Sequence, residues 1–126
     1  MKADFLIITN NPMVDSKFRA DHQVNYREVD DMQVLKSVRD YIHAGHLLLT
    51  HPLAGSIKPN ETPYKSVMLT KGKHELNFQS VKIIEESIHV CEKFSSNIKA
   101  YKQEVFTDFQ HIDCSLIESA IASAMA

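Results

Sequence analysis

Four consecutive apolar residues near the start of the chain constrain its fold more than any other feature. The run Phe5–Ile8 contains no polar residue and is closed by Thr9-Asn10-Asn11-Pro12. Because neighbouring side chains of a strand point to opposite faces, an unbroken apolar run predicts a strand that is covered on both faces. Such strands are typical of parallel sheets. Leu47-Leu48-Leu49 repeats the pattern and predicts a second buried strand.

Helical patterns follow the first of these runs. Asn10 or Asn11 can cap a short helix whose first turn holds Pro12, with Val14 and Phe18 facing the sheet. A clearer helix begins at Asp30-Asp31 and ends at Gly45. Its apolar positions form one stripe: Val34, Leu35, Val38, Tyr41 and Ile42.

The segment Val24–Val29 alternates between apolar and polar residues and predicts an edge strand. With right-handed crossovers, the three strands take the order second-first-third. We therefore expect a single α/β domain over residues 1–126, a three-layer sandwich with a small, mainly parallel sheet. Ser66–Thr70 is a candidate for a short fourth strand, and the C-terminal third is expected to be helical.

In that C-terminal third, apolar residues recur at helical spacing from Phe78 to about Asn97. Residues 104–112 are compatible with helix or strand, and a last helix is expected to start near Asp113 or Ser115. Its narrow face of small and apolar residues suits close packing on another helix, within the chain or across a homodimer. That face consists of Leu116, Ile117, Ala120, Ile121 and Ala124.

The stretch Thr50–Lys65 is an irregular connection that contains three of the four prolines. Proline fixes φ and removes a hydrogen-bond donor, so neither a helix nor a central strand can run through it. In the expected strand order this loop and Thr9–Pro12 meet at the carboxyl ends of neighbouring strands. Ligands of open α/β sheets bind in such a crevice.

The residue types at this crevice favour a small anionic ligand, since amide, hydroxyl and ammonium donors lie beside the start of a helix. The candidate ligand-binding residues are Thr9, Asn10, Asn11, His51, Ser56, Lys58, Asn60, Thr62, Tyr64 and Lys65. The alternative is that Asn10 only caps the helix and the lysines are solvated. No glycine-rich nucleotide motif is present, and no cofactor is predicted.

His51 is the candidate general base if the chain catalyses a reaction, because imidazole titrates near neutrality. The alternative is a structural histidine that pins the loop. A metal site assembled from His43, His46, His51 and Glu61 is not predicted, since Gly45 separates the first two and no metal-ligand spacing supports them. Cys91 and Cys114 are expected to be reduced, buried thiols.

The net charge of −2 gives no basic footprint for nucleic acid or for an acidic membrane surface. The first apolar run is too short for a signal peptide or a membrane span. These features favour a cytoplasmic protein.

Several segments of the chain resemble the GrdX family. They are Thr9–Pro12, Val38–His46, Thr50–Ser56 and, most distinctively, Lys58-Pro59-Asn60-Glu61-Thr62-Pro63-Tyr64-Lys65. The resemblance implies an association with the selenium-dependent glycine, sarcosine and betaine reductase system of amino-acid-fermenting anaerobes. It implies an accessory or regulatory role and transfers no catalytic residue. The sequence contains no CxxC pair, which agrees with a role outside redox chemistry.

The leading expectation is therefore an accessory protein whose crevice binds a small anion or a component of the reductase. One alternative is a small hydrolase- or transferase-like enzyme that uses His51 as its base. Another is a dimeric interaction module without a small-molecule site.

Overall fold

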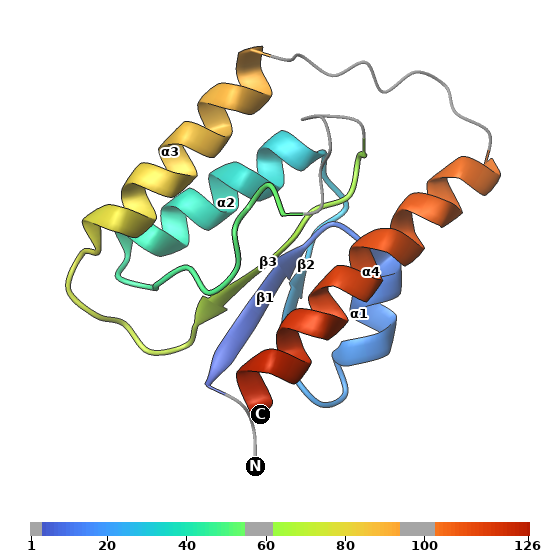
Figure 1. Cartoon of the computed structure of the whole chain (residues 1–126), viewed down its shortest axis with the longest axis horizontal. Helices are drawn as coiled ribbons and strands as arrows, with labels where there is room; N and C mark the ends of the chain where they lie inside the picture. Colours follow the sequence, from blue (N-terminus) through green and yellow to red (C-terminus); the bar gives the residue numbers. More distant parts are fainter. Residues whose placement is uncertain (1–3, 55–61, 94–102) are drawn as a thin grey trace.

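The fold is a mixed α/β arrangement, described here from a computed structural model that covers residues 4–54, 62–93 and 103–126 (Figure 1). Its helices and strands are, in chain order, β1 (Phe5–Thr9), α1 (Pro12–Phe18), β2 (Gln23–Tyr26), α2 (Asp31–His43), β3 (Ser66–Thr70), α3 (Phe78–Lys93) and α4 (Gln103–Met125).

The described strands form one sheet with the order β2-β1-β3. β1 and β2 are parallel, whereas β1 and β3 are antiparallel (Figure 1). At the end of β1, Thr9 lies opposite Tyr26 of β2 on one side and Ser66 of β3 on the other. The carboxyl ends of β1 and β2 and the amino end of β3 therefore lie at the same end of the sheet.

Helices cover both faces of the sheet, and each face has its own apolar cluster (Figure 1). Leu6 and Ile8 pack with α2 and α3, and Phe5 and Ile7 pack with α1 and α4. Every residue of β1 is buried. The prediction that the first apolar run is covered on both faces is confirmed.

The first two helices agree with the sequence pattern. Asn11 caps α1 by accepting a hydrogen bond from the Met13 amide, and Val14 and Phe18 are buried. Asp30 caps α2 in the same way, through the Gln33 amide. Gly45, just after α2, has a φ of 109°, which fits the prediction that it ends the helix. β2 lies at the edge of the sheet, as its alternating pattern predicts.

The prediction of a buried strand at Leu47–Leu49 is wrong. Leu48 makes only an isolated antiparallel bridge to Leu69, and Leu49 is 49% exposed. Side-chain hydroxyls replace part of the regular ladder here, since Thr70 Oγ1 accepts from the Leu47 amide and Ser80 Oγ from the Leu48 amide. The third strand of the sheet is instead Ser66–Thr70, so the sheet is mixed rather than mainly parallel.

The C-terminal part is helical, and residues 104–112 lie within α4. α4 begins at Gln103, earlier than the predicted start near Asp113 or Ser115. The predicted extension of α3 to about Asn97 lies outside the described residues. Ile117 and Ile121 are buried in the cluster shared with α1, so these two residues of the predicted face pack within the chain, whereas Leu116 is 41% exposed. A homodimer stays a prediction.

Among the described residues, no helix is both long and apolar enough to cross a membrane.

Candidate functional site

The Asn10 side chain holds together three segments at the edge where β1 and β2 end. Its amide nitrogen donates to the carbonyl oxygens of Val29, at 2.9 Å, and Pro63, at 2.7 Å. Its amide oxygen accepts from the Lys65 backbone amide at 2.9 Å. Asn10 is only 6% exposed, so these three bonds satisfy a buried polar group. They fix the turn after β2 and the end of the proline-rich loop against β1.

A second network attaches α4 to the same edge. Asp113 Oδ2 accepts from the Ser66 hydroxyl at 2.6 Å and from the Asn11 amide group at 3.0 Å. Since the Ser66 proton is directed at Asp113, the Thr9 hydroxyl donates to Ser66 Oγ at 2.7 Å. Burial raises the pKa of Asp113, although the bonds from Ser66 and Asn11 oppose this shift. The network positions the N-terminal half of α4 over the strand ends.

A pocket of about 330 Å³ lies where these segments meet. It is partly open, and its described lining comes from the ends of β1 and β2, the segment before β3, and α4. The lining residues are Asn10, Pro12, Tyr26, Glu28, Val29, Asp30, Pro63, Tyr64, Phe106 and Gln110. Its volume is at the lower end of the range for small-molecule sites.

The lining combines aromatic rings with carboxylates. Tyr26, Tyr64 and Phe106 are half-buried, while Glu28 and Asp30 are exposed. Burial raises the pKa of the Tyr26 hydroxyl, and the nearby Glu28 carboxylate adds to this effect. No lysine, arginine or histidine is among the described residues that line the pocket. The pocket therefore offers negative charge and aromatic surface.

Three buried titratable groups, one just before β3, one on α2 and one on α3, interact through their charges. Lys65 is 3% exposed, Asp31 4% and Cys91 2%. Burial lowers the pKa of Lys65, and the charges of Cys91, Asp31 and Asp113 oppose that shift. Burial also raises the pKa values of Asp31 and Cys91. The Asp31 Oδ2 atom is buried without a hydrogen-bond partner.

The structure brings five of the predicted ligand-binding residues together, although only two of them line the pocket. Asn10 and Tyr64 are lining residues, and the Tyr64 hydroxyl accepts from Gln110 Nε2 at 2.8 Å. Thr9 and Asn11 belong to the Asp113 network. The Lys65 backbone amide donates to Asn10, and the Lys65 side chain is buried.

Of the other predicted site residues, Thr62 and His51 are not among the described residues that line this pocket. Thr62 accepts from the Tyr64 amide, and Ser56, Lys58 and Asn60 lie outside the described residues. His51 is exposed and its Nδ1 accepts from the Leu53 amide at 3.1 Å. Catalysis by His51 stays a prediction. No group of metal-binding side chains is found in the part of the chain that the structure describes.

Sequence reasoning missed most of the pocket. The alternating pattern of the edge strand did place Tyr26 and Glu28 on one face, which is a usable signal. No sequence pattern marked Phe106, Gln110 or Asp113 as site residues, because α4 reaches the site from the far end of the chain. Asn11 Nδ2, for example, donates to the Gln110 carbonyl across 99 positions.

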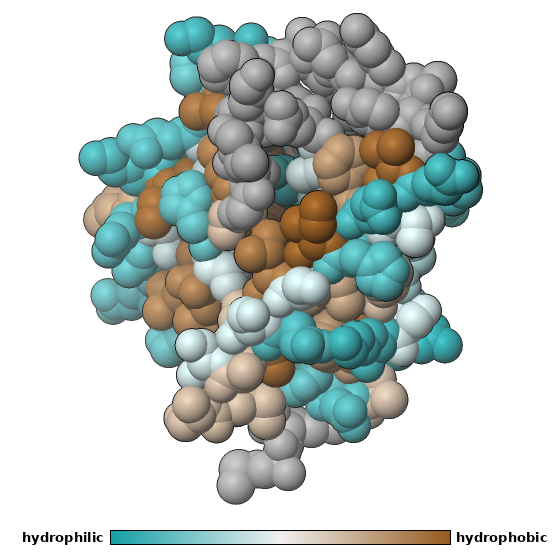
Figure 2. Space-filling view, turned by 45° about the vertical axis from the view of Figure 1, so that its right-hand side comes forward, coloured by the Kyte–Doolittle hydropathy of each residue, from teal (hydrophilic) through white to brown (hydrophobic). Residues whose placement is uncertain are grey.

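A second hollow, of about 350 Å³, lies along α4 and is more open. Its lining residues all belong to this one helix: His111, Ile112, Ser115, Leu116 and Ser119. Figure 2 shows one face of the molecule, where hydrophobic surface gathers near the middle and hydrophilic surface lies around it. The α4 hollow lacks the convergence of several segments that distinguishes the pocket at the strand ends.

The fold and the pocket define a small α/β protein with a polar and aromatic pocket beside the carboxyl ends of two parallel strands. The chain belongs to the GrdX-like protein family, whose sequence model matches residues 6–122. No curated protein and no solved structure matches the chain. The resemblance to the GrdX family seen in the sequence is thereby confirmed over nearly the whole chain.

Proposed function

We propose that this protein is an accessory protein of an amino-acid reductase system and binds a small molecule in the pocket at the ends of β1 and β2. The observation that carries the binding proposal is the convergence of four segments on one pocket. Asn10 holds three of them, and Asp113 attaches the fourth, α4. The association with glycine, sarcosine or betaine reductase is what membership of the GrdX-like family suggests.

The position of the pocket supports a binding role. In open α/β sheets, ligands bind outside the carboxyl ends of parallel strands, where backbone and loops leave a crevice. Tyr26 and Asn10 come from two such ends, and α4 closes a third side with Phe106 and Gln110. Small-anion binding stays a prediction. The described lining residues include no cationic side chain that would attract an anion.

A reconstituted assay tests the accessory role. Purified reductase is assayed for turnover of glycine, sarcosine and betaine, each with and without an equimolar amount of this protein. We expect the protein to change turnover of at least one substrate, and Gln110→Ala to reduce that change. Asp21→Asn, on the turn between α1 and β2, is the matched control. Unchanged turnover of all three substrates would contradict the accessory role.

A further inference from the structure

We propose that the pocket at the strand ends takes a small organic cation whose charged group is a primary or N-methylated ammonium. This inference rests on the proposed small-molecule binding and names the chemical class of the ligand. Three features of the lining support this inference: its aromatic rings, its charges and the hydrogen bonds that its side-chain amide groups already make.

The aromatic rings come from three separate segments. Tyr26 ends β2, Tyr64 precedes β3 and Phe106 belongs to α4, and all three line the same 330 Å³ space. The face of an aromatic ring attracts an ammonium group, and several rings around one space are the usual way in which proteins hold N-methylated cations. A neutral apolar ligand would gain contact area here but not this attraction.

The charges on the lining are all of one sign. Glu28 and Asp30 contribute carboxylates, and the described lining contains no basic side chain. An anion entering the pocket would meet these carboxylates, and none of the described lining residues supplies a compensating positive charge. A cation would be attracted to both, and the attraction would be moderate because the two side chains are exposed to solvent.

The Asn10 amide, which could otherwise bind an anion, is already engaged within the protein. Its nitrogen donates to the Val29 and Pro63 carbonyls, so both of its protons are used. Gln110 Nε2 donates to the Tyr64 hydroxyl, which leaves one proton of that amide for other partners. The described lining therefore offers an anion few free donors and offers a cation aromatic side chains and carboxylates.

Isothermal titration calorimetry with matched probes tests the inference. The probes are choline, ethanolamine, acetate and the neutral isostere of choline, 3,3-dimethylbutan-1-ol. At low ionic strength we expect choline or ethanolamine to bind and acetate not to bind. The dissociation constant of the neutral isostere should be larger than that of choline by about fivefold or more. Binding of the cation should weaken as salt is added, because the carboxylates are exposed.

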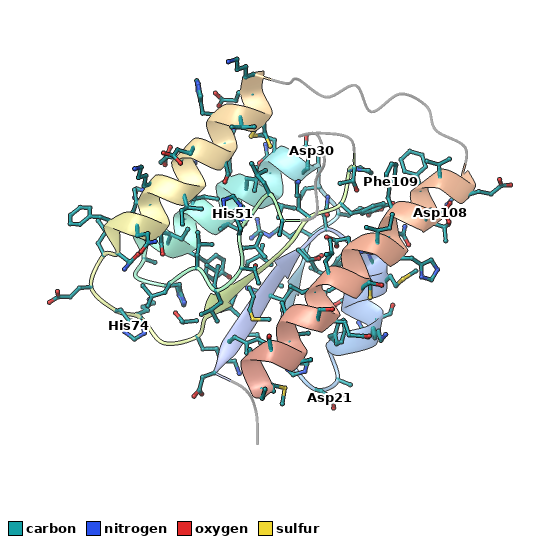
Figure 3. All side chains as sticks on the ribbon, viewed as in Figure 1. Asp21, Asp30, His51, His74, Asp108 and Phe109 are labelled. Carbon is teal, nitrogen blue, oxygen red and sulfur yellow. The ribbon has the colours of Figure 1, made fainter. Side chains whose placement is uncertain are left out.

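Charge-neutral variants of the lining add a second readout. Glu28→Gln and Asp30→Asn should each weaken cation binding by about two- to fivefold, the range of an exposed ion pair. Asn is as good an N-cap as Asp, so Asp30→Asn retains the start of α2. Asp21→Asn removes the same charge from the opposite end of the molecule and should leave binding unchanged (Figure 3).

The outcomes separate this inference from the proposed function. If the isostere or acetate binds as tightly as the cations, the ligand class is wrong while small-molecule binding survives. Cation binding that Glu28→Gln and Asp30→Asn leave intact would also overturn the inference. If none of the four probes binds at millimolar concentration, the cation inference fails. The proposed function then fails too if the reductase substrates also leave the protein unbound.

Discussion

At the scale of single residues, buried polar groups define this edge of the sheet. Asn10 is satisfied by three hydrogen bonds, whereas Asp31 Oδ2 is buried without a partner. A buried acceptor that makes no hydrogen bond costs stability, and a charged one costs more. Burial therefore disfavours the charged form of Asp31, although the Lys65 charge and backbone hydrogen bonds offset part of this penalty.

The substitution Asp31→Asn should increase the free energy of unfolding at pH 7. Burial raises the pKa of Asp31 above its value in the unfolded chain, so the folded state holds the proton more tightly. The stability that this group contributes is complete below the unfolded pKa and is lost as pH rises through the folded pKa. Urea unfolding between pH 4 and pH 8 measures the effect.

In the wild type, stability should fall as pH rises through this window, and Asp31→Asn should flatten the curve. Asp113, whose pKa is also raised by burial, would account for a residual slope of the same sign. Asp21→Asn is the control, because Asp21 is exposed and its charge is not among the causes of the raised pKa of Asp31. A loss of stability at pH 7 on Asp31→Asn would contradict this account of the buried carboxylate.

At the scale of elements, the turn after α2 depends on Gly45. Its φ of 109° is one that side-chain-bearing residues rarely adopt. A Cβ atom at this position would lie 2.5 Å from the His74 backbone oxygen, and the Gly45 carbonyl accepts from the His74 amide at 2.8 Å. The helix end and the segment before α3 are therefore fitted to a glycine.

We expect Gly45→Ala to destabilise the protein by about 1–3 kcal/mol, since it adds backbone strain and a backbone clash. Gly72→Ala is the matched control, because a Cβ there would meet only the His74 side chain at 3.8 Å. Thermal unfolding of both variants checks this. Equal melting temperatures for the two would show that the turn tolerates a side chain.

Elements with a strong local signal could be predicted from the sequence. β1, α1 and α2 follow from an unbroken apolar run, a proline at a helix start and an apolar stripe with an aspartate cap. Leu47–Leu49 has the same apolar signal as β1 but pairs only once. Hydroxyl groups distant in sequence accept from the Leu47 and Leu48 amides, while the Leu49 amide still donates to the Met68 carbonyl. No local pattern could reveal these partners.

At the scale of the whole molecule, the pocket depends on contacts between the two ends of the chain. Sequence reasoning placed Thr9–Pro12 beside the proline-rich loop, and the structure also brings them together. The structural reason for this proximity differs from the one expected from the sequence. The end of the loop lies beside the carboxyl end of β1 because β3 starts there and runs antiparallel to β1. The contribution of α4 depends on long-range packing that a single sequence does not encode locally.

The most direct test of the pocket as the functional site is an NMR titration of ¹⁵N-labelled protein with choline. We predict that amide shifts will change at Val29, Tyr64, Phe106 and Gln110, which line the pocket. Asp21 and His74, which lie away from Asp30 in Figure 3, should keep their shifts. Shift changes confined to the α4 hollow at His111–Ser119, or absent from the lining residues at saturating ligand, would contradict the account.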